Sequence, residues 1–271
     1  MSFTTFYQAA IAQHEVKPEK KGHSLFRPVP KERMREIQTD RPDVTENSYT
    51  VDAGHFQYET DLFKTIRNKQ NGILNVQNIY NHVNLKLGLT NTTDIQVVIE
   101  SFIKNIDIIN NNSSKSTGFG DITLRIKQNL WGNDNGKTAF AIMPYINLPT
   151  SRFSESEVTE GGIVFPFAIE LKNDWSLGTQ FGMDLLKNPN DTNYHTEILY
   201  SFTANNKLAT KLDSFVESSY MYNFKEKDFH LSVNGGFGFS ITDNFKLDTG
   251  FNYGITKATD KVYFAGFSFR Y

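Results

Sequence analysis

Residues 261–271 read KVYFAGFSFRY, and this stretch decides the fold. In a β-strand successive side chains point to opposite faces. One face would therefore carry Tyr263, Ala265, Phe267, Phe269 and Tyr271, and the other Gly266, Ser268 and Arg270. An apolar face, a wet face and an aromatic last residue are typical of the closing strand of an outer-membrane β-barrel. A soluble β-sandwich strand could carry the same stripe, so the rest of the chain must separate the two.

The composition favours strands over helices. The 271 residues include 23 Phe, 12 Tyr, 18 Gly and no Cys, and aromatic and β-branched residues are enriched in strands. No run approaches the roughly 18 apolar residues that a transmembrane helix requires, whereas the strands of a membrane barrel are individually only half apolar. The missing Cys excludes disulfides and thiolate metal sites, and a formal charge of −2 gives no basic footprint for nucleic acid. The sequence therefore predicts no cofactor, no metal site and no nucleic-acid partner.

The same alternation recurs from residue 54 onward. Twelve strands are predicted, at residues 54–65, 76–89, 94–104, 119–130, 137–147, 161–171, 174–184, 194–203, 208–222, 229–240, 245–253 and 261–271. An even number is what a closed bacterial barrel with both chain ends on one side requires. The predicted fold is all-β: a single 12-stranded antiparallel transmembrane up-and-down β-barrel over residues 51–271, preceded by an irregular N-terminal extension over residues 1–50.

The connections between these strands alternate in length. Short turns rich in Asn, Asp and Gly are predicted near residues 90–93, 132–136, 172–174, 204–206 and 242–244. The intervening connections are mostly longer and polar, at residues 66–75, 105–118, 148–160, 185–193, 223–227 and 254–260. A membrane barrel has short periplasmic turns and longer extracellular loops, and a sandwich has no reason to sort them. We therefore expect the outer membrane of a Gram-negative bacterium as the location, with membrane lipid as a partner.

The face opposite the aromatic residues is highly charged. It carries ten acids and seven bases, namely Glu59, Asp61, Lys86, Glu100, Lys104, Asp121, Arg125, Lys127, Glu170, Asp184, Glu197, Lys211, Asp213, Glu217, Lys246, Asp248 and Arg270. A soluble core could not bury so many charges, since each costs several kcal/mol unless it is paired. These residues are predicted to line a wet lumen of mixed charge.

The first fifty residues do not follow the strand pattern. Residues 17–33 are charged and contain Pro, which indicates an irregular segment that hangs in the periplasm or enters the lumen. No complete signal peptide is evident, although residues 10–12 have the small-x-small form of a cleavage site. Asp40, Arg41 and Asp43 are candidates for a gate or plug, with Arg41 pairing an inward acid. The alternative is that Pro42 stiffens the entry to the first strand while the two Asp residues bond to local backbone.

Three blocks of the sequence carry a family resemblance. Residues 39–46 read TDRPDVTE, residues 54–60 read GHFQYET, and residues 118–122 and 146–151 read GFGDI and INLPTS. Together these resemble the family named for the meta-pathway of phenol degradation, whose members are commonly labelled transporters and regarded as outer-membrane barrels. The resemblance covers residues 39–271 and implies passage of small, aromatic or hydrophobic molecules. It also implies that the C-terminal strand, ending at Tyr271, is recognised by the barrel-assembly machinery.

Three functions are compatible with such a barrel. The first is a passive channel or transporter, without a catalytic step. The second is a structural or partner-binding barrel whose lumen is sealed by salt bridges. The third is an outer-membrane hydrolase, because four histidines face inward together with Ser232, namely His55, His82, His195 and His230. No helical zinc-protease motif, nucleophile elbow or phosphate loop supports an enzyme.

Overall fold

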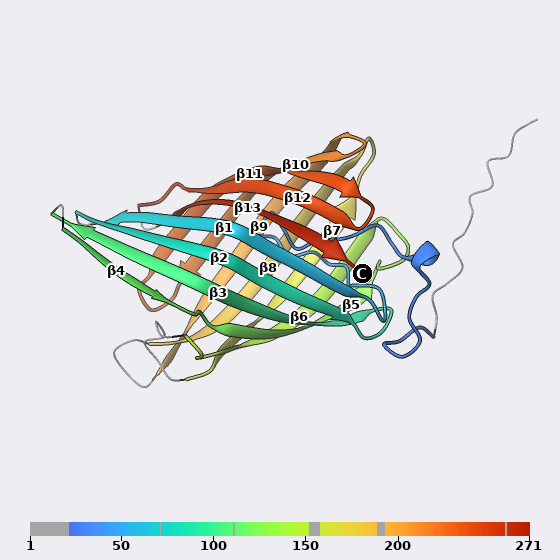
Figure 1. The fold of residues 1–271 in the computed structure, drawn as a ribbon, viewed down its shortest axis with the longest axis horizontal. Coiled ribbons are helices and arrows are strands. Elements are labelled where there is room, and N and C mark those ends of the chain that lie inside the picture. The colour runs from blue at the N-terminus through green and yellow to red at the C-terminus, as the bar shows by residue number, and fades with distance from the viewer. Residues whose placement is uncertain (1–21, 71, 111, 152–157, 189–192, 258) are drawn as a thin grey trace, which may run out of the picture.

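The barrel is a single antiparallel sheet that closes on itself (Figure 1). The computed structural model describes residues 22–70, 72–110, 112–151, 158–188, 193–257 and 259–271. Its strands are β1 (Phe56–Gln70), β2 (Ile73–Gly88), β3 (Thr93–Ile109), β4 (Asn112–Gly118), β5 (Ile122–Trp131), β6 (Thr138–Leu148), β7 (Glu160–Glu170), β8 (Trp175–Lys187), β9 (Tyr194–Ala209), β10 (Leu212–Asn223), β11 (Asp228–Thr242), β12 (Phe245–Gly254) and β13 (Lys261–Arg270). A 3-10 turn, η1 (Lys31–Arg33), precedes them. None of the helical structure in the described residues is long and apolar enough to span a membrane.

Twelve of the strands form the closed ring that the sequence predicts. β13 pairs with β1, where Phe269 lies opposite Tyr58, and this pairing closes the barrel. β5 pairs with the first half of β3, from Thr93 to Ile99. β4 pairs with the second half of β3 and stands outside the ring as its extension. The predicted fold class is therefore confirmed, with one additional short strand.

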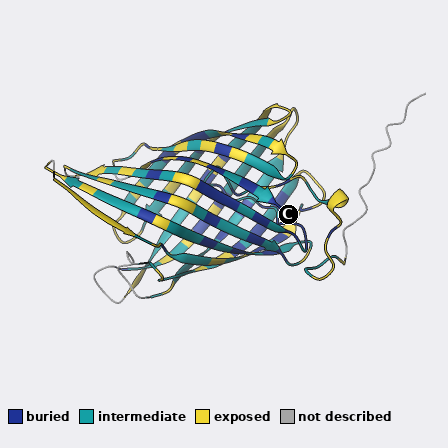
Figure 2. Ribbon diagram, viewed as in Figure 1, coloured by how far each residue is buried: buried dark blue, intermediate teal, exposed yellow. Residues whose placement is uncertain are grey.

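The aromatic face of the sheet is the outside of the barrel, and buried and exposed positions alternate along the strands (Figure 2). Along β11 and β12 the apolar side chains of Phe237, Phe239 and Phe251 are exposed, whereas the neighbouring Asn234 and Asp248 are buried inside. Burying an apolar face in lipid and keeping the polar face in the lumen is the arrangement of a membrane barrel. Aromatic side chains also gather near both ends of the outer wall, among them Trp175 and Phe239 at the turn end and Tyr220, Tyr253 and Tyr263 at the loop end.

Three predicted connections are wrong. Within residues 105–118, β3 continues to Ile109 and residues 112–118 form β4. Residues 204–206 lie inside β9, which continues to Ala209, and the turn to β10 is formed by Thr210 and Lys211. Residues 66–75 are not a long loop, since β1 and β2 pair as far as Gln70 and Ile73. These strand ends carry polar residues on both faces, so they lack the alternation from which strands were predicted. Lys211 therefore lies exposed in a turn and not in the lumen.

A bulge across β1 and β2 changes which residues face inward. The pairing shifts register between Asp61 and Phe63, and Asn81 on β2 adopts a left-handed φ of 56°, which Asn tolerates better than most residues. Beyond the bulge, Phe102 of β3 is exposed on the outer wall and Ile103 is buried. Lys104 follows one position later and shares the outer face with Phe102. The prediction that Lys104 lines the lumen is therefore wrong, because a bulge resets the alternation.

Candidate functional site: a lumen occupied by residues 35–52

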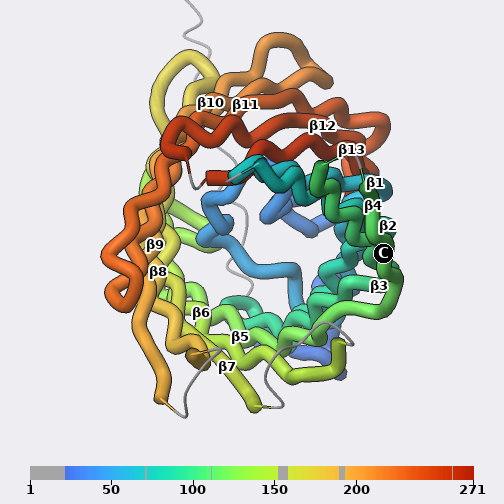
Figure 3. Tube along the Cα trace, turned by 90° about the vertical axis from the view of Figure 1, so that its left-hand side faces the viewer, coloured from blue at the N-terminus to red at the C-terminus, as the bar shows by residue number. Residues whose placement is uncertain are grey.

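Residues 35–52, the lumen segment, run through the inside of the barrel (Figure 3). The segment forms no strand, so its backbone groups need partners other than a sheet ladder. Wall side chains supply them: Gln57 Nε2 donates to the carbonyl of Gln38 over 2.7 Å, and Asn129 Nδ2 donates to that of Ser48 over 2.9 Å. Polar residues that alternate on the inner wall thus take the place of neighbouring strands.

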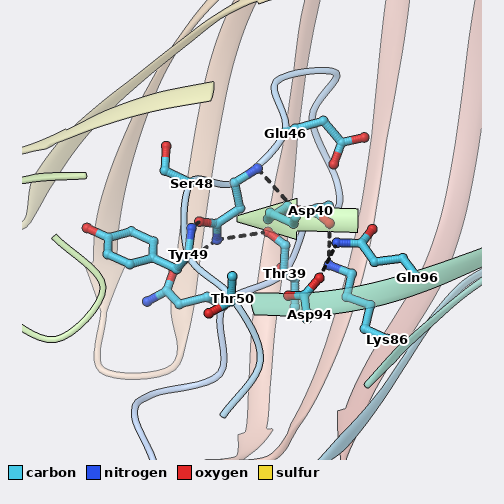
Figure 4. A network of polar contacts seen from close by, with 12 residues as sticks. Thr39, Asp40, Glu46, Ser48, Tyr49, Thr50, Lys86, Asp94 and Gln96 are labelled. Carbon is cyan, nitrogen blue, oxygen red and sulfur yellow. Dashed lines mark hydrogen bonds and ion pairs between the residues drawn. The ribbon is translucent and has the colours of Figure 1, made fainter. Parts of the chain in front are cut away.

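Asp40 is the centre of the first ion-pair cluster (Figure 4). Its carboxylate accepts from Lys127 Nζ at 2.6 Å and pairs with Lys86, which also pairs with Glu59. The backbone N–H of Asp40 donates to Glu59 Oε2 over 3.0 Å. Burial alone would raise the pKa of Asp40, but the two ammonium groups more than offset it and hold the pKa well below the usual range. Asp40 is therefore a charged anchor on β1, β2 and β5.

Arg41 joins two further acids of the wall. Its Nη2 lies 2.5 Å from Asp248 Oδ1 on β12, and its Nη1 bonds to Asp61 on β1. Burial disfavours the charged guanidinium, but the two carboxylates outweigh that cost and raise the pKa of Arg41 above its ordinary value. The guanidinium also lies 5.7 Å from the ring centre of Phe264. Arg41 therefore pairs with inward acids, as the gate or plug interpretation of residues 40–43 predicts.

The next residues of the segment dock on β10 and β5. Glu217 accepts from the backbone N–H groups of Val44 and Thr45 over 2.9 and 2.7 Å, and Arg125 donates to Glu46 Oε1 over 2.7 Å. Burial raises the pKa of Asp43 well above its usual range, and the nearby Glu217 carboxylate raises it further. Residue 43 therefore favours a protonated carboxyl, in contrast to the charged Asp40.

The segment enters the barrel through a clamp at the turn end. Arg35 Nε and Arg270 Nη1 lie 3.2 and 3.3 Å from opposite oxygens of Asp52. Arg270 also donates to the carbonyl of Arg35 over 2.7 Å. Arg270 was predicted as a lumen residue, whereas Arg35 and Asp52 were missed because they lie outside the strand pattern. Arg270 lies 218 residues from Asp52 and 235 from Arg35 along the chain. No sequence signal links residues so far apart.

Five neutral polar residues and one acid of the inner wall were left out of the predicted site residues. They share the inward face with the predicted charges and are buried, namely Gln57, Asp94, Gln96, Asn129, Gln180 and Asn234. The same alternation would have found them had the list not been restricted to the most evident charges. For example, Asp94 accepts from the N–H of Val51 at 2.9 Å, and Gln180 accepts from that of Glu46 at 2.7 Å.

Cavities lie on both sides of the lumen segment. The cavity at the turn end measures about 350 Å³ and reaches Glu170, Asp213 and Lys246. Two cavities towards the loop end measure about 460 and 260 Å³ and share a lining that includes Glu46, His82 and Arg125. Glu100, Asp121 and Asp184 line the larger of these. Residues 41–43 and 46 line both the turn-end cavity and the 260 Å³ cavity, so they form the partition between the two compartments.

The inward histidines lie in separate environments. His55 bonds to the carbonyls of Val29 and Tyr271 at the turn end, and His82 bonds to Asp61 over 3.0 Å. His195 contacts Asn188 and Glu197, and His230 lies 3.5 Å from Asp228 at the loop end. Ser232 bonds to Ser219 and Asn234. Within the described residues no group of His, Cys, Asp and Glu has the arrangement of a metal site.

A family model described as "Putative MetA-pathway of phenol degradation" matches residues 39–271. The chain belongs to this family. The match begins at Thr39 and so takes in most of the lumen segment together with the barrel, as the resemblance in the sequence predicts. A comparison with curated proteins finds no match.

Solved structures similar to this chain are outer-membrane barrels. One is an outer-membrane channel from Pseudomonas putida F1, with 10% sequence identity and a TM-score of 0.54, over 80% of this chain and 94% of that one. Another is the NanC porin, with 8% identity and a TM-score of 0.52, over 78% of this chain and 98% of that one. At such low identity the likeness establishes the fold, an outer-membrane β-barrel, and leaves function to the site itself.

Proposed function

We propose that the chain is a passive channel in the outer membrane of a Gram-negative bacterium, which admits small molecules past a gate formed by the lumen segment. The observation that carries the proposal is the pair of polar compartments that meet at residues 41–43 and 46. A barrel built only to support the membrane has no need for polar cavities on both sides of the lumen segment. Family membership makes small aromatic or hydrophobic molecules the first substrates to test. No catalytic step is part of the proposal.

Passage through this barrel requires the segment to move. Asp40 ties the segment to β2 and β5 through ion pairs, and Arg41 ties it to β1 and β12. The charged groups of these ion pairs are largely buried. The charged groups of an ion pair can be either paired with each other or separately hydrated. The free energies of these two states differ little, because solvation offsets the Coulomb attraction. The segment is therefore suited to be a gate, with Asp40, Arg41 and Asp43 at the partition and the charged wall residues as the path.

Planar-bilayer recordings of the full chain test this function. We expect discrete openings, and we expect more frequent openings for Arg41→Gln, because this change removes both ion pairs across the partition. The control Lys207→Gln removes only the exposed 3.6 Å pair with Glu36 at the turn end and should leave openings unchanged. If the full chain, Arg41→Gln and a chain starting at residue 51 all insert and carry negligible current, the channel is rejected.

The density of contacts on the lumen segment favours a second candidate, the sealed structural barrel. In that case the ion pairs of Asp40 and Arg41 would hold the lumen permanently shut. Swelling of protein-containing liposomes in small sugars and phenol separates the two candidates, because a sealed barrel gives the same rate as empty liposomes.

A further inference from the structure

Residues 24–33, the rim strap, lie outside both the barrel wall and the lumen. Ser24 forms a bridge with Thr90 in the β2–β3 turn, and the N–H of Leu25 donates to the carbonyl of Leu89 over 2.8 Å. At the other end of the strap, Lys31 Nζ lies 4.3 Å from the centre of the Tyr271 ring. The strap therefore follows the turn-end rim from the β2–β3 turn to the C-terminus.

The strap is held firmly in this position. Val29 is 2% exposed, its N–H donates to the carbonyl of Ala53 over 3.0 Å, and its own carbonyl lies 2.6 Å from His55 Nε2. Pro28 and Pro30 flank it and restrict the backbone on either side. The backbone of the strap around Val29 is thus fixed against the barrel rim.

The side chains that the strap presents are those of a membrane interface. Phe26 is 93% exposed, the highest value among the large apolar residues described. Arg27, Lys31 and Arg33 are also exposed, and the one acid within the strap is Glu32. Tyr271, next to Lys31, lies on the lipid-facing side of β13 because it continues the series of Phe267 and Phe269. An exposed aromatic residue with basic neighbours at the turn-end rim matches a surface of anionic lipid.

We propose that the rim strap binds anionic phospholipid in the turn-side leaflet, with Phe26 inserted at the interface and Arg27, Lys31 and Arg33 contacting headgroup phosphates. The strap leads directly into the lumen segment at Arg35, so this contact fixes the entry point of that segment against the membrane. The inference concerns the outside of the barrel and holds whether or not the lumen conducts.

Depth measurements on the full chain test the proposal. The sequence contains no Cys, so Phe26→Cys gives a single site for a nitroxide label. In liposomes of phosphatidylethanolamine and phosphatidylglycerol, we expect the label to be accessible to oxygen and shielded from a water-soluble nickel chelate. Glu36→Cys is the matched control, because it belongs to the same N-terminal region but lines the aqueous turn-end cavity. Equal nickel accessibility at residues 26 and 36, in protein with normal heat-modifiable mobility, overturns the proposal.

A charge variant tests the headgroup contact separately. Replacing Arg27, Lys31 and Arg33 by Gln leaves the anchors at Leu25 and Val29 intact, so the barrel should fold as before. Each basic residue near an anionic surface strengthens association roughly fivefold. We therefore expect the triple variant to lose most of its preference for spin-labelled phosphatidylglycerol over phosphatidylcholine. An unchanged preference overturns the assignment of these residues to anionic lipid.

Discussion

Arg41 is the residue whose replacement most directly tests how the lumen segment is held. Its guanidinium serves two wall carboxylates, Asp61 and Asp248, whose side chains are 6% and 2% exposed, and is itself 13% exposed. Arg41→Gln keeps a polar side chain of similar reach but removes the charge. Both carboxylates then stay buried without their counter-ion whenever the segment is docked.

The size of this effect follows from the burial of the pair. Removing one partner of a buried ion pair costs about 3–5 kcal/mol, because an uncompensated charge is left behind. All three side chains are less than one-sixth exposed, so solvent screening removes little of this cost. Each 1.4 kcal/mol is a factor of ten in an equilibrium. The undocked population of the segment should therefore rise by roughly a hundredfold to several thousandfold, with 3 kcal/mol as the safer end of the range.

Cysteine labelling measures this population. Ser48 is 1% exposed and its hydroxyl has no hydrogen-bond partner in the described residues, so Ser48→Cys is a mild probe of the docked segment. A buried thiol reacts in proportion to the open population when opening and closing are fast. We expect Arg41→Gln to accelerate the reaction of this introduced thiol with a membrane-impermeant maleimide by about a hundredfold or more, whereas Lys207→Gln should change it less than about fivefold.

A labelling rate within twofold of the parent would refute the reasoning. It would mean that the amide bonds to Glu217 and Asp94 hold the segment without help from Arg41. Combining Arg41→Gln with Asp61→Asn and Asp248→Asn gives a second check, because neutral amides need no counter-ion. This combination should return the rate towards that of the parent if the cost arises from stranded carboxylates.

Two further predictions concern pH and lipid contact. Burial and the Glu217 carboxylate raise the pKa of Asp43 in the docked state. Docking of the segment therefore takes up a proton. The docked state is stabilised as pH falls from neutral towards the ordinary Asp pKa and is destabilised as pH rises. Openings in bilayers should accordingly become rarer between pH 7 and about 5. Asp43→Asn should weaken this dependence, and Glu46, whose pKa burial also raises, should account for the rest. Openings that increase on acidification would contradict the prediction. Trp131 and Trp175 are about half exposed on the outer wall, so brominated acyl chains should quench most of the intrinsic tryptophan fluorescence, and quenching by aqueous iodide instead would contradict the membrane orientation.

The barrel was predictable because one face of every strand is dry. Membrane strands such as β12 must alternate, since a basic side chain that faces the middle of the bilayer costs about 2–4 kcal/mol, and this period of two is visible in a single sequence. The alternation is lost where the outer face of a strand no longer contacts lipid. The ends of β1 and β2 extend beyond the apolar part of the wall, and their residues were therefore predicted as a loop. The alternation also changes at the bulge near Asn81, where one extra residue exchanges the inner and outer faces of the sheet. Lys104, on the neighbouring strand beyond this bulge, was therefore assigned to the wrong face.

The lumen segment was predictable only in part. The charges of Asp40, Arg41 and Asp43 in an otherwise irregular stretch indicate a plug, but alternation identifies the face of a wall residue and not its partner. Asp248 lies 207 residues from Arg41 along the chain. Such pairs arise from the curvature of the closed sheet, which carries no local signature.

The corrections to the predicted lumen-lining residues explain why the wall and the lumen segment stabilise each other. With Lys104 outside and Lys211 in a turn, the predicted lumen charges fall from seven bases to five, while all ten acids keep an inward or mouth position. A twelve-stranded barrel is also too wide for its own side chains to fill. The wall alone would hold Asp61 and Asp248 near each other, with only its own partners such as His82, which bonds to Asp61 over 3.0 Å. Arg41 adds a positive charge that binds both acids, and the segment supplies the missing core, so the wall acids act as docking sites whose repulsion returns when the segment leaves. That returning repulsion raises the free energy of the undocked state and favours return of the segment, whereas hydration of the freed charges offsets part of it. A small difference between these two terms is what a reversible gate requires.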